Sequence, residues 1–315
     1  SPKLRHESYY GTRLSGVIGM SERGSTPLTA VTHNGKFHAD EVIATAVLTT
    51  IYPDLRVVRS RDQAVIEGAD IVYDVGGVYD HQIKRYDHHQ NGALKRADGL
   101  TRSALGLIWL HYGTEYCEGD RRAAERIDQL FVRGIDARDN GELAVPHDVH
   151  TPDYGISQVI EQLNPILENA ESYEVQFLVA VGRAAEILSR LKEKTRAELQ
   201  TEDAVIEARV LSGDPRYALL DRQITPPDSL AETDGFEYLV FPEQTNETWQ
   251  IYAIRTPEDP FKSKRPFPES WAGLTGEALV QQTGVAGALF CHSKRFLTVA
   301  KTKKDALALL AQALQ

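Results

Sequence analysis

Two adjacent histidines follow an aspartate in the segment Arg85-Tyr86-Asp87-His88-His89-Gln90, and these residue types can together hold a divalent metal. Neutral imidazole is a common metal ligand, and a neighbouring carboxylate can fix the tautomer of the ring. Because neighbouring side chains of an extended segment point to opposite sides, one histidine can face a metal while the other faces a phosphate oxygen. A polar surface loop is the alternative that two histidines taken alone leave open.

Other acidic and histidine clusters lie in the same half of the chain and extend the set of metal-ligand candidates. Oxygen and imidazole donors without a thiolate suit Mn²⁺, Mg²⁺, Co²⁺ or Zn²⁺. Three carboxylates around two such ions leave a net positive charge that attracts phosphate, and two neighbouring metals can hold both the attacking water and the departing oxygen. Asp74 is expected to bridge the two ions. The candidates are His33, His38, Asp40, Asp74, His88, His89, Asp136 and Asp139.

Alternating strand and helix patterns surround these candidates and predict a parallel sheet with helices on its faces. Ligands collect beyond the carboxyl ends of the strands in such sheets, and His33, Asp74 and His88 all fall at predicted strand ends. The helix that begins near Asp40 has the spacing of one buried face. The expected elements are strands at Leu28–Thr32, Leu55–Val58 and Ile71–Val75, and a helix from Asp40 to Ile51.

Helical patterns dominate the middle of the chain, and strand patterns follow them. Helices are expected at Ser103–Tyr112, Arg121–Arg138 and Glu171–Leu199, and the loop Pro146–Pro152 carries two histidines, His147 and His150, that are expected to be solvated. The later runs predict a smaller mixed domain with a mainly antiparallel sheet. They are strands at Ala204–Leu211, Tyr217–Leu220, Phe236–Phe241, Thr248–Arg255 and within Gly287–Ala300, with helices at Thr275–Gln282 and Asp305–Leu314.

The 315 residues have room for two domains, each with a core of its own. We expect a metal-binding domain at 26–170, a connecting helix at 171–200 and a C-terminal substrate-binding domain at 201–315. Residues 1–25 lack a clear periodicity and are expected to be a disordered extension or tag, with Met20 as the natural start.

Composition excludes several classes of protein. The net charge of −10 excludes a generally basic nucleic-acid binder, and no apolar run approaches the length needed to cross a membrane. The two cysteines, Cys117 and Cys291, have no CxxC neighbour and indicate buried thiols in a reducing compartment. A cytoplasmic location is therefore expected, or an organellar one if residues 1–19 are a transit segment.

One basic stretch lies near the C-terminal end of this acidic chain. Residues 255–304 contain nine lysines and arginines against four acidic residues. A solvated basic face and a surface that contacts a phosphate backbone both explain this excess. The cations with the strongest claim to such a contact are Lys262, Lys264, Arg265, Lys294, Arg295 and Lys301.

The ordered clusters around residues 33–40, 74, 87–89 and 136–139 resemble the motifs of the DHH phosphoesterase superfamily, which includes RecJ-type exonucleases and family II inorganic pyrophosphatases. More narrowly, the chain resembles the Myg (melanocyte proliferating gene) family of metal-dependent hydrolases with 3′–5′ RNA exonuclease activity. The segments that carry this resemblance are Thr32–Glu41, Asp74–Asp80, Arg85–Gln90, Leu163-Asn164-Pro165, Pro266–Trp271 and Phe290-Cys291-His292.

The resemblance implies a fold and a set of residue roles. The fold is a DHH-type parallel-sheet domain with helices on both faces, joined by a long helix to a smaller mixed α+β domain. His33, His38 and Asp74 would hold one metal, and Asp40, Asp74, His88 and Asp139 the second, with Asp136 competing for the place of Asp139. Asp87 would support its neighbours without binding metal, and His89 would contact the phosphate. Substrate binding would involve His89, His292, Arg295, Lys301 and Arg265.

The leading hypothesis is a two-metal phosphodiesterase, most consistent with Mn²⁺, that removes nucleotides from the 3′ end of RNA or short single-stranded oligonucleotides by metal-activated water attack. His89, Asp87 and Asp74 are the catalytic candidates. A small-molecule phosphohydrolase of the pyrophosphatase or nucleotide type is the alternative enzyme, and a non-catalytic metal- or RNA-binding module is the alternative outside enzymes. The oligomeric state is open between a monomer and a homodimer.

Overall fold

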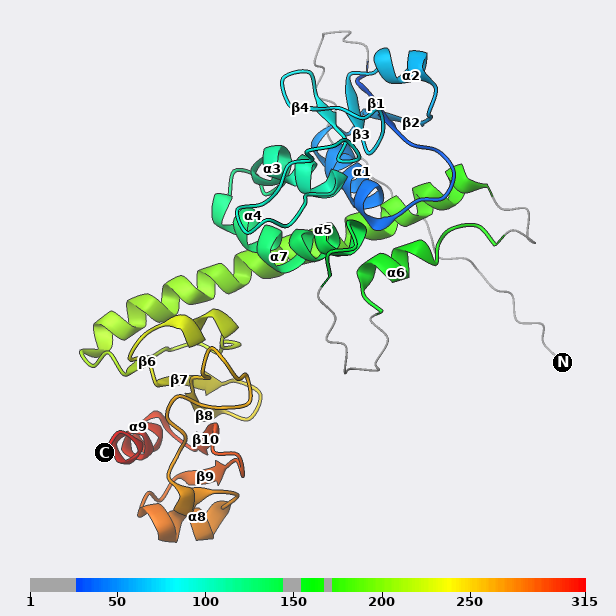
Figure 1. The fold of residues 1–315 in the computed structure, drawn as a ribbon. Coiled ribbons are helices and arrows are strands. Elements are labelled where there is room, and N and C mark those ends of the chain that lie inside the picture. Colours follow the sequence, from blue (N-terminus) through cyan, green and yellow to red (C-terminus); the bar gives the residue numbers. More distant parts are fainter. Residues whose placement is uncertain (1–26, 144–153, 167–171) are drawn as a thin grey trace, which may run out of the picture.

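Two five-stranded sheets and a long helix between them make up the computed structural model, which describes residues 27–143, 154–166 and 172–315 (Figure 1). The first sheet is mainly parallel and the second mainly antiparallel, which confirms the α/β class with a mixed C-terminal part. Residues 1–25 and the loop histidines His147 and His150 lie outside the described ranges. No helix within those ranges is long and apolar enough to cross a membrane.

The first sheet has the strand order β2-β1-β3-β5-β4, and only the edge strand β4 runs antiparallel to its neighbour. Because β1, β3 and β5 are adjacent and parallel, their carboxyl ends meet at one edge of the sheet. His33 and Asp74 come directly after β1 and β3, and His88 lies two residues beyond the end of β5, so all three fall at strand ends as predicted. The bounds are β1 (Thr29–Thr32), β2 (Arg56–Arg59), β3 (Ile71–Tyr73), β4 (Tyr79–Asp80) and β5 (Arg85–Tyr86).

Helices cover both faces of this sheet. On one face, α1 (Ala39–Ile51) packs against α3 (Ala104–Tyr116), α6 (Ile156–Glu161) and the long helix α7. On the other, Val31 and Val72 pack near Ile66 of the short helix α2 (Gln63–Glu67). The expectation that α1 buries a single face is wrong, because every residue from Ala39 to Leu48 is buried between its neighbours.

The predicted helix at Arg121–Arg138 is present, but it contains a π-helical turn. α4 (Arg121–Ile127) leads into the π turn η1 (Asp128–Val132) and then into α5 (Arg133–Asp139). The extra residue of a π turn changes the direction in which later side chains point. α5 ends at the same edge of the molecule as the strand ends, and it contributes Asp139 there.

The connecting helix is longer than expected. α7 runs from Tyr173 to Ser212 and ends at Gly213, which adopts a left-handed conformation with φ 74°. The predicted strand at Ala204–Leu211 is therefore wrong. Its alanine, glutamate and arginine residues are good helix formers, and between Gly182, inside the helix, and Gly213 the chain has no glycine or proline that would stop the helix.

The second sheet has the order β6-β7-β8-β10-β9. α9 (Lys303–Ala313) packs across one face, over a core that includes Ile251 and Phe267. The last turns of α7 pack against β6 and contribute Val205 to a second core on the opposite face. The remaining bounds are β6 (Tyr217–Leu219), β7 (Tyr238–Glu243), β8 (Thr248–Ala253), β9 (Ala288–Cys291), β10 (Leu297–Ala300), α8 (Gly276–Thr283), and the 3₁₀ turns η3 (Asp228–Glu232) and η4 (Glu269–Trp271).

Candidate metal centre

Asp74 lies between two histidines at the centre of the strand-end cluster. One carboxylate oxygen, Oδ2, is 3.1 Å from His33 Nε2, and the other, Oδ1, is 3.2 Å from His88 Nε2. The residue is buried and its backbone is left-handed, with φ 55°, a conformation that aspartate tolerates better than most residues. Backbone strain of this kind concentrates at functional sites. Burial raises the pKa of Asp74, but His33 and His88 outweigh it and lower the pKa to about 2.

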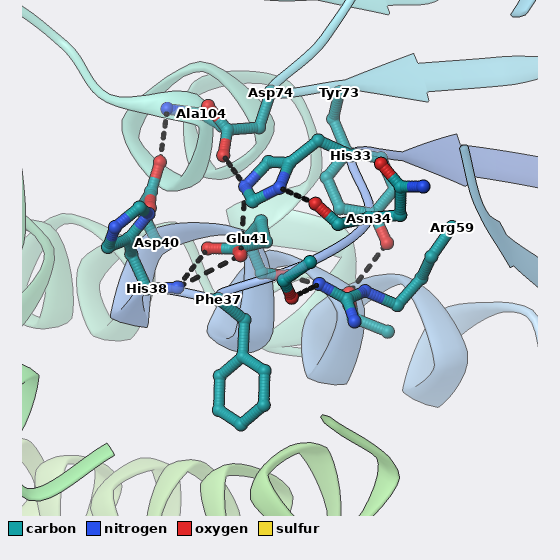
Figure 2. A network of polar contacts seen from close by, with 12 residues as sticks. His33, Asn34, Phe37, His38, Asp40, Glu41, Arg59, Tyr73, Asp74 and Ala104 are labelled. Carbon is teal, nitrogen blue, oxygen red and sulfur yellow. Dashed lines mark hydrogen bonds and ion pairs between the residues drawn. The ribbon is translucent and has the colours of Figure 1, made fainter. Parts of the chain in front are cut away.

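The ring of His33 presents a nitrogen lone pair to two carboxylates (Figure 2). Its Nδ1 lies 3.1 Å from the carbonyl oxygen of Asn34, which can only accept a hydrogen bond, so the ring proton sits on Nδ1. Nε2 then faces Glu41 Oε1 and Asp74 Oδ2, each at 3.1 Å. Burial lowers the pKa of His33, but these two carboxylates outweigh it and raise the pKa to about 10. The arrangement needs a cation, either a proton or a metal.

A network behind His88 sets the tautomer of that ring in the same way. The Nδ2 amide of Asn140 donates to the carbonyl oxygens of Thr101, at 3.1 Å, and Asp136, at 2.9 Å. The amide oxygen of Asn140 therefore faces His88 Nδ1, at 3.2 Å, and accepts its proton. Nε2 of His88 is left with its lone pair directed at the carboxylate cluster.

Three carboxylates meet the free nitrogen of His88. Its Nε2 lies 3.2 Å from Asp74 Oδ1, 3.3 Å from Asp139 Oδ2 and 3.9 Å from Asp40 Oδ2. Burial lowers the pKa of His88, but Asp74 and Asp139 outweigh it and raise the pKa to about 8. Burial also raises the pKa of Asp139, and it raises that of Asp40 well above the usual range with the help of the neighbouring charges.

Buried polar atoms without partners identify where a cation fits. Asp40 Oδ1, Asp74 Oδ1 and His88 Nε2 are buried and have no hydrogen-bond partner within the described chain. The second oxygen of Asp40 accepts only a 3.3 Å hydrogen bond from the amide of Ala104, at the start of α3. Leaving such groups unpaired is costly, whereas a divalent ion between them would satisfy all three. The donor set fits the metals expected from the sequence.

His89 lies on the open side of this cluster, with its Nδ1 3.7 Å from Asp74 Oδ1 and its ring centre 4.3 Å from that of His88. Its side chain is 63% exposed, whereas that of His88 is 6% exposed. Asp87 Oδ1 accepts a 2.7 Å hydrogen bond from His89 Nδ1, and its Oδ2 accepts a 2.6 Å bond from the amide of Gly77. The buried carboxylate of Asp87 thus fixes the ring and leaves His89 Nε2 free to meet a ligand.

Glu41 is a member of the cluster that sequence reasoning assigned only to a helix start. Its carboxylate accepts from the backbone amide of His38 at 2.9 and 3.0 Å, and it also faces His33. The rings of His33 and His38 are 6.0 Å apart, and His38, Glu41 and His33 offer ligand atoms within 4.8 Å of one another. Glu41 could have been recognised as a candidate, because it is one of two adjacent acidic residues in a helix that has no exposed side.

The loop between His33 and His38 is held by Asn164 of the Leu163-Asn164-Pro165 segment. The side-chain oxygen of Asn164 accepts from the Phe37 amide at 2.9 Å, and its amide nitrogen donates to the Phe37 carbonyl at 2.8 Å. This pairing satisfies both backbone groups of Phe37. It ties α6 to the loop that carries two predicted metal ligands.

The cluster opens into a pocket of about 720 Å³. Arg61, Arg138, Ser157 and Glu161 complete the wall around the histidines and aspartates. None of the predicted substrate-binding residues of the C-terminal part lines this pocket. Those residues lie around the second sheet, where Arg295 donates to the Phe267 carbonyl, Arg265 pairs with Glu237, and His292 and Lys301 flank β10.

Asp136 is not directed at the metal cluster, which corrects its assignment as a ligand candidate. Its Oδ1 accepts from the amide and hydroxyl of Ser103, at 3.0 and 2.7 Å, and its Oδ2 pairs with Arg96 at 2.7 Å. A Cβ at Gly106 would lie only 2.3 Å from this carboxylate, so the glycine allows α3 to approach it. The π turn and the helical spacing place Asp139, one turn later, in the cluster instead.

Replacing Asp136 with alanine is therefore expected to destabilise the fold. Removing this carboxylate breaks a buried ion pair and leaves the Ser103 amide and hydroxyl without their acceptor, although Arg96 keeps Asp128 at 2.6 Å, so we expect the free energy of unfolding to fall by about 1–3 kcal/mol. Urea unfolding of the metal-free chain measures this change. The matched control is Asp139→Ala, three residues away, which removes a carboxylate with a raised pKa and should cost little stability while weakening metal binding. A stable Asp136→Ala variant with weakened metal binding would contradict the structural role.

A family model and two curated proteins each match most of this chain. Residues 29–314 match the model of MYG1_exonuc, described as an uncharacterised protein family (UPF0160). A MYG1 protein of Chlamydia trachomatis is 32% identical over 87% of this chain and 92% of its own length. The MYG1 exonuclease of Homo sapiens is 29% identical over 88% of this chain and 83% of its own length.

A solved structure is more distantly similar. It is a pGpG-specific phosphodiesterase, PggH, of Vibrio cholerae, with 15% identity and a TM-score of 0.31 over 92% of this chain and 99% of that chain. At this score the similarity supports no inference about the site.

Proposed function

The chain belongs to the MYG1_exonuc family (UPF0160), and from this premise we propose that it is a divalent-metal-dependent phosphodiesterase that acts as an exonuclease. The observation that carries the proposal is the arrangement of two histidine lone pairs around Asp74, with His33 Nε2 at its Oδ2 and His88 Nε2 at its Oδ1, and with Asp40 and Asp139 beside His88. The exonuclease name of the human relative supports the same reaction class. The finer proposal is 3′–5′ cleavage of RNA or short single-stranded oligonucleotides.

The residues divide into two proposed ligand sets that share Asp74. His33, His38 and Asp74 would hold one ion, with Glu41 beside them, and Asp40, Asp74, His88 and Asp139 would hold the other. When bound, divalent ions supply the Lewis acidity that activates water and offsets charge on a phosphate. Mn²⁺ is the first metal to test, because this mixed oxygen and imidazole set lacks a thiolate.

The residues of the chain orient the proposed ligands and exclude water from around them. Asn34 and Asn140 hold the tautomers of His33 and His88, so that each ring meets a cation through Nε2 without rotating. Asp87 aims His89 into the pocket by accepting from its Nδ1, so Nε2 can donate to a phosphate oxygen when both ring nitrogens carry a proton. Burial keeps the carboxylates out of water, which strengthens their attraction for a cation.

Hydrolysis of end-labelled substrates with Mn²⁺ tests this proposal. Single-stranded RNA labelled at its 5′ end should be shortened progressively from the 3′ end with release of nucleoside monophosphates, and EDTA should stop the reaction. DNA and pyrophosphate in parallel assays separate the alternatives. Turnover of pyrophosphate alone would indicate a small-molecule phosphohydrolase, and RNA binding with no turnover of any substrate would indicate a non-catalytic module.

A further inference from the structure

A row of aromatic rings crosses the second sheet on the face opposite α9. Ile251 and Ala253 of β8 are buried in the core beneath α9, so Tyr252, between them, points to the other face. The ring of Tyr252 lies 6.2 Å from Phe296, which lies 4.4 Å from His292, which in turn lies 6.1 Å from Phe290. All four rings are only partly buried.

A fifth ring stands beside this row and is almost fully exposed. Phe261 is 83% exposed at the tip of the loop that follows β8. The loop is ordered, because the amide of Thr256 donates to the Lys262 carbonyl at 2.9 Å and the amide of Phe261 donates to Asp259 at 2.8 Å. A structured loop thus holds a large apolar ring in water, and the ring is significant because Lys294 connects it to the row of rings, which makes it part of a larger exposed aromatic surface.

Cations accompany these rings. Lys294, in the turn between β9 and β10, lies 5.9 Å from the centre of the Phe261 ring, and Arg255 lies 6.0 Å from the centre of Tyr252. The Lys294 amide also donates to His292 Nδ1 at 3.0 Å. Lys294 therefore contacts both the Phe261 ring and the row of rings. Lys262 is exposed and Arg295 partly so, in a chain whose net charge is −10.

We propose that this surface stacks the bases of single-stranded nucleic acid while its cations contact the phosphates. We call it the aromatic platform, and it consists of Tyr252, Phe261, Phe290, His292 and Phe296 with Arg255, Lys262, Lys294 and Arg295. Aromatic rings interleaved with cations suit unpaired bases on a charged backbone, because every base has a face that stacks and every linkage carries a negative charge. Arg255 lies 3.4 Å from Asp228 and Lys262 lies 3.8 Å from Asp259, whereas Lys294 and Arg295 have no ion pair among the described residues and would gain one from a phosphate. The inference deepens the proposed function, on which it rests, by assigning where the strand is held beyond the metal pocket.

Binding of a fluorescent single-stranded oligonucleotide, measured by anisotropy in EDTA, tests the platform without any hydrolysis. Phe261→Ala should weaken affinity at least about fivefold, since one base–aromatic contact is worth about 1–3 kcal/mol. Phe261→Trp should retain affinity, whereas Phe261→Leu, which stays apolar but cannot stack, should behave like the alanine variant. Leu211→Ala is the matched control, because Leu211 is 78% exposed on α7, outside the platform, and should bind as the unmodified chain does.

Two outcomes would overturn the platform. Unchanged affinity of Phe261→Ala would show that the ring does not contact the strand. Full affinity of Phe261→Leu would show that apolar contact suffices and would favour a protein partner for this loop. Hydrolysis of bis(4-nitrophenyl) phosphate by the unmodified chain with Mn²⁺ reports separately on the proposed function, so a failure there leaves the binding result intact.

Discussion

Replacing Asp74 with asparagine should abolish turnover and weaken metal binding together. Among the described residues, Asp74 is the one carboxylate that faces both His33 and His88, so its loss would remove the shared charge between the two proposed dications. We expect metal affinity to fall at least about a hundredfold, the upper end of the loss seen when a group that merely supports a ligand is removed. Calorimetric titration with Mn²⁺ and hydrolysis of a labelled oligonucleotide measure the two effects.

Asparagine is the right substitution because the backbone at residue 74 is left-handed, with φ 55°. Asparagine tolerates this conformation, whereas alanine adds backbone strain to the lost charge. Far-UV circular dichroism and urea unfolding should show a folded chain. A variant that keeps full activity with two metals bound would remove Asp74 from the bridging position.

Replacing His88 and His89 in turn should produce opposite losses. His88→Ala should lose metal affinity first, because Nε2 of His88 faces three carboxylates in the buried cluster. His89→Ala should lower turnover by about 10²–10⁴-fold, the usual contribution of a side chain that acts on the reacting group, while metal affinity stays within a few-fold. The same two assays, run on both variants, measure the difference.

The control for this pair is His89→Asn, which keeps a hydrogen-bond donor on a shorter side chain and should recover part of the turnover. Equal loss of metal affinity in His88→Ala and His89→Ala would show that both rings bind metal.

Much of the candidate metal centre was predictable from the sequence, because its residues lie where strands end. β1 and β3 were visible as apolar runs, a short strand was expected before His88, and a parallel sheet brings the residues after such strands to one edge. His33, Asp74 and His88 meet there for that reason. The choice between Asp136 and Asp139 needed the structure, since a π turn precedes α5 and decides which carboxylate reaches the cluster.

Other features depended on contacts between distant segments. Asn140 and Asn164 hold the ligands through hydrogen bonds that no local pattern encodes, the second across 127 positions of sequence. The alternating apolar residues of Ala204–Leu211 suggested a strand, but no stop signal separates them from the helix before them. The platform ring of Phe261 could not be found either, because an apolar residue in a sequence is normally assigned to a core.

The most direct test is diffraction from crystals grown with Mn²⁺ and measured at the manganese absorption edge. If Asp74 bridges two metals, anomalous difference maps should show two peaks roughly 3.5–4 Å apart, one beside His33 and one beside His88. Each peak should lie within bonding distance of Asp74. A map of catalytically active protein with no peak at Asp74, or with manganese only at other residues, would contradict the assignment of this cluster as the metal centre.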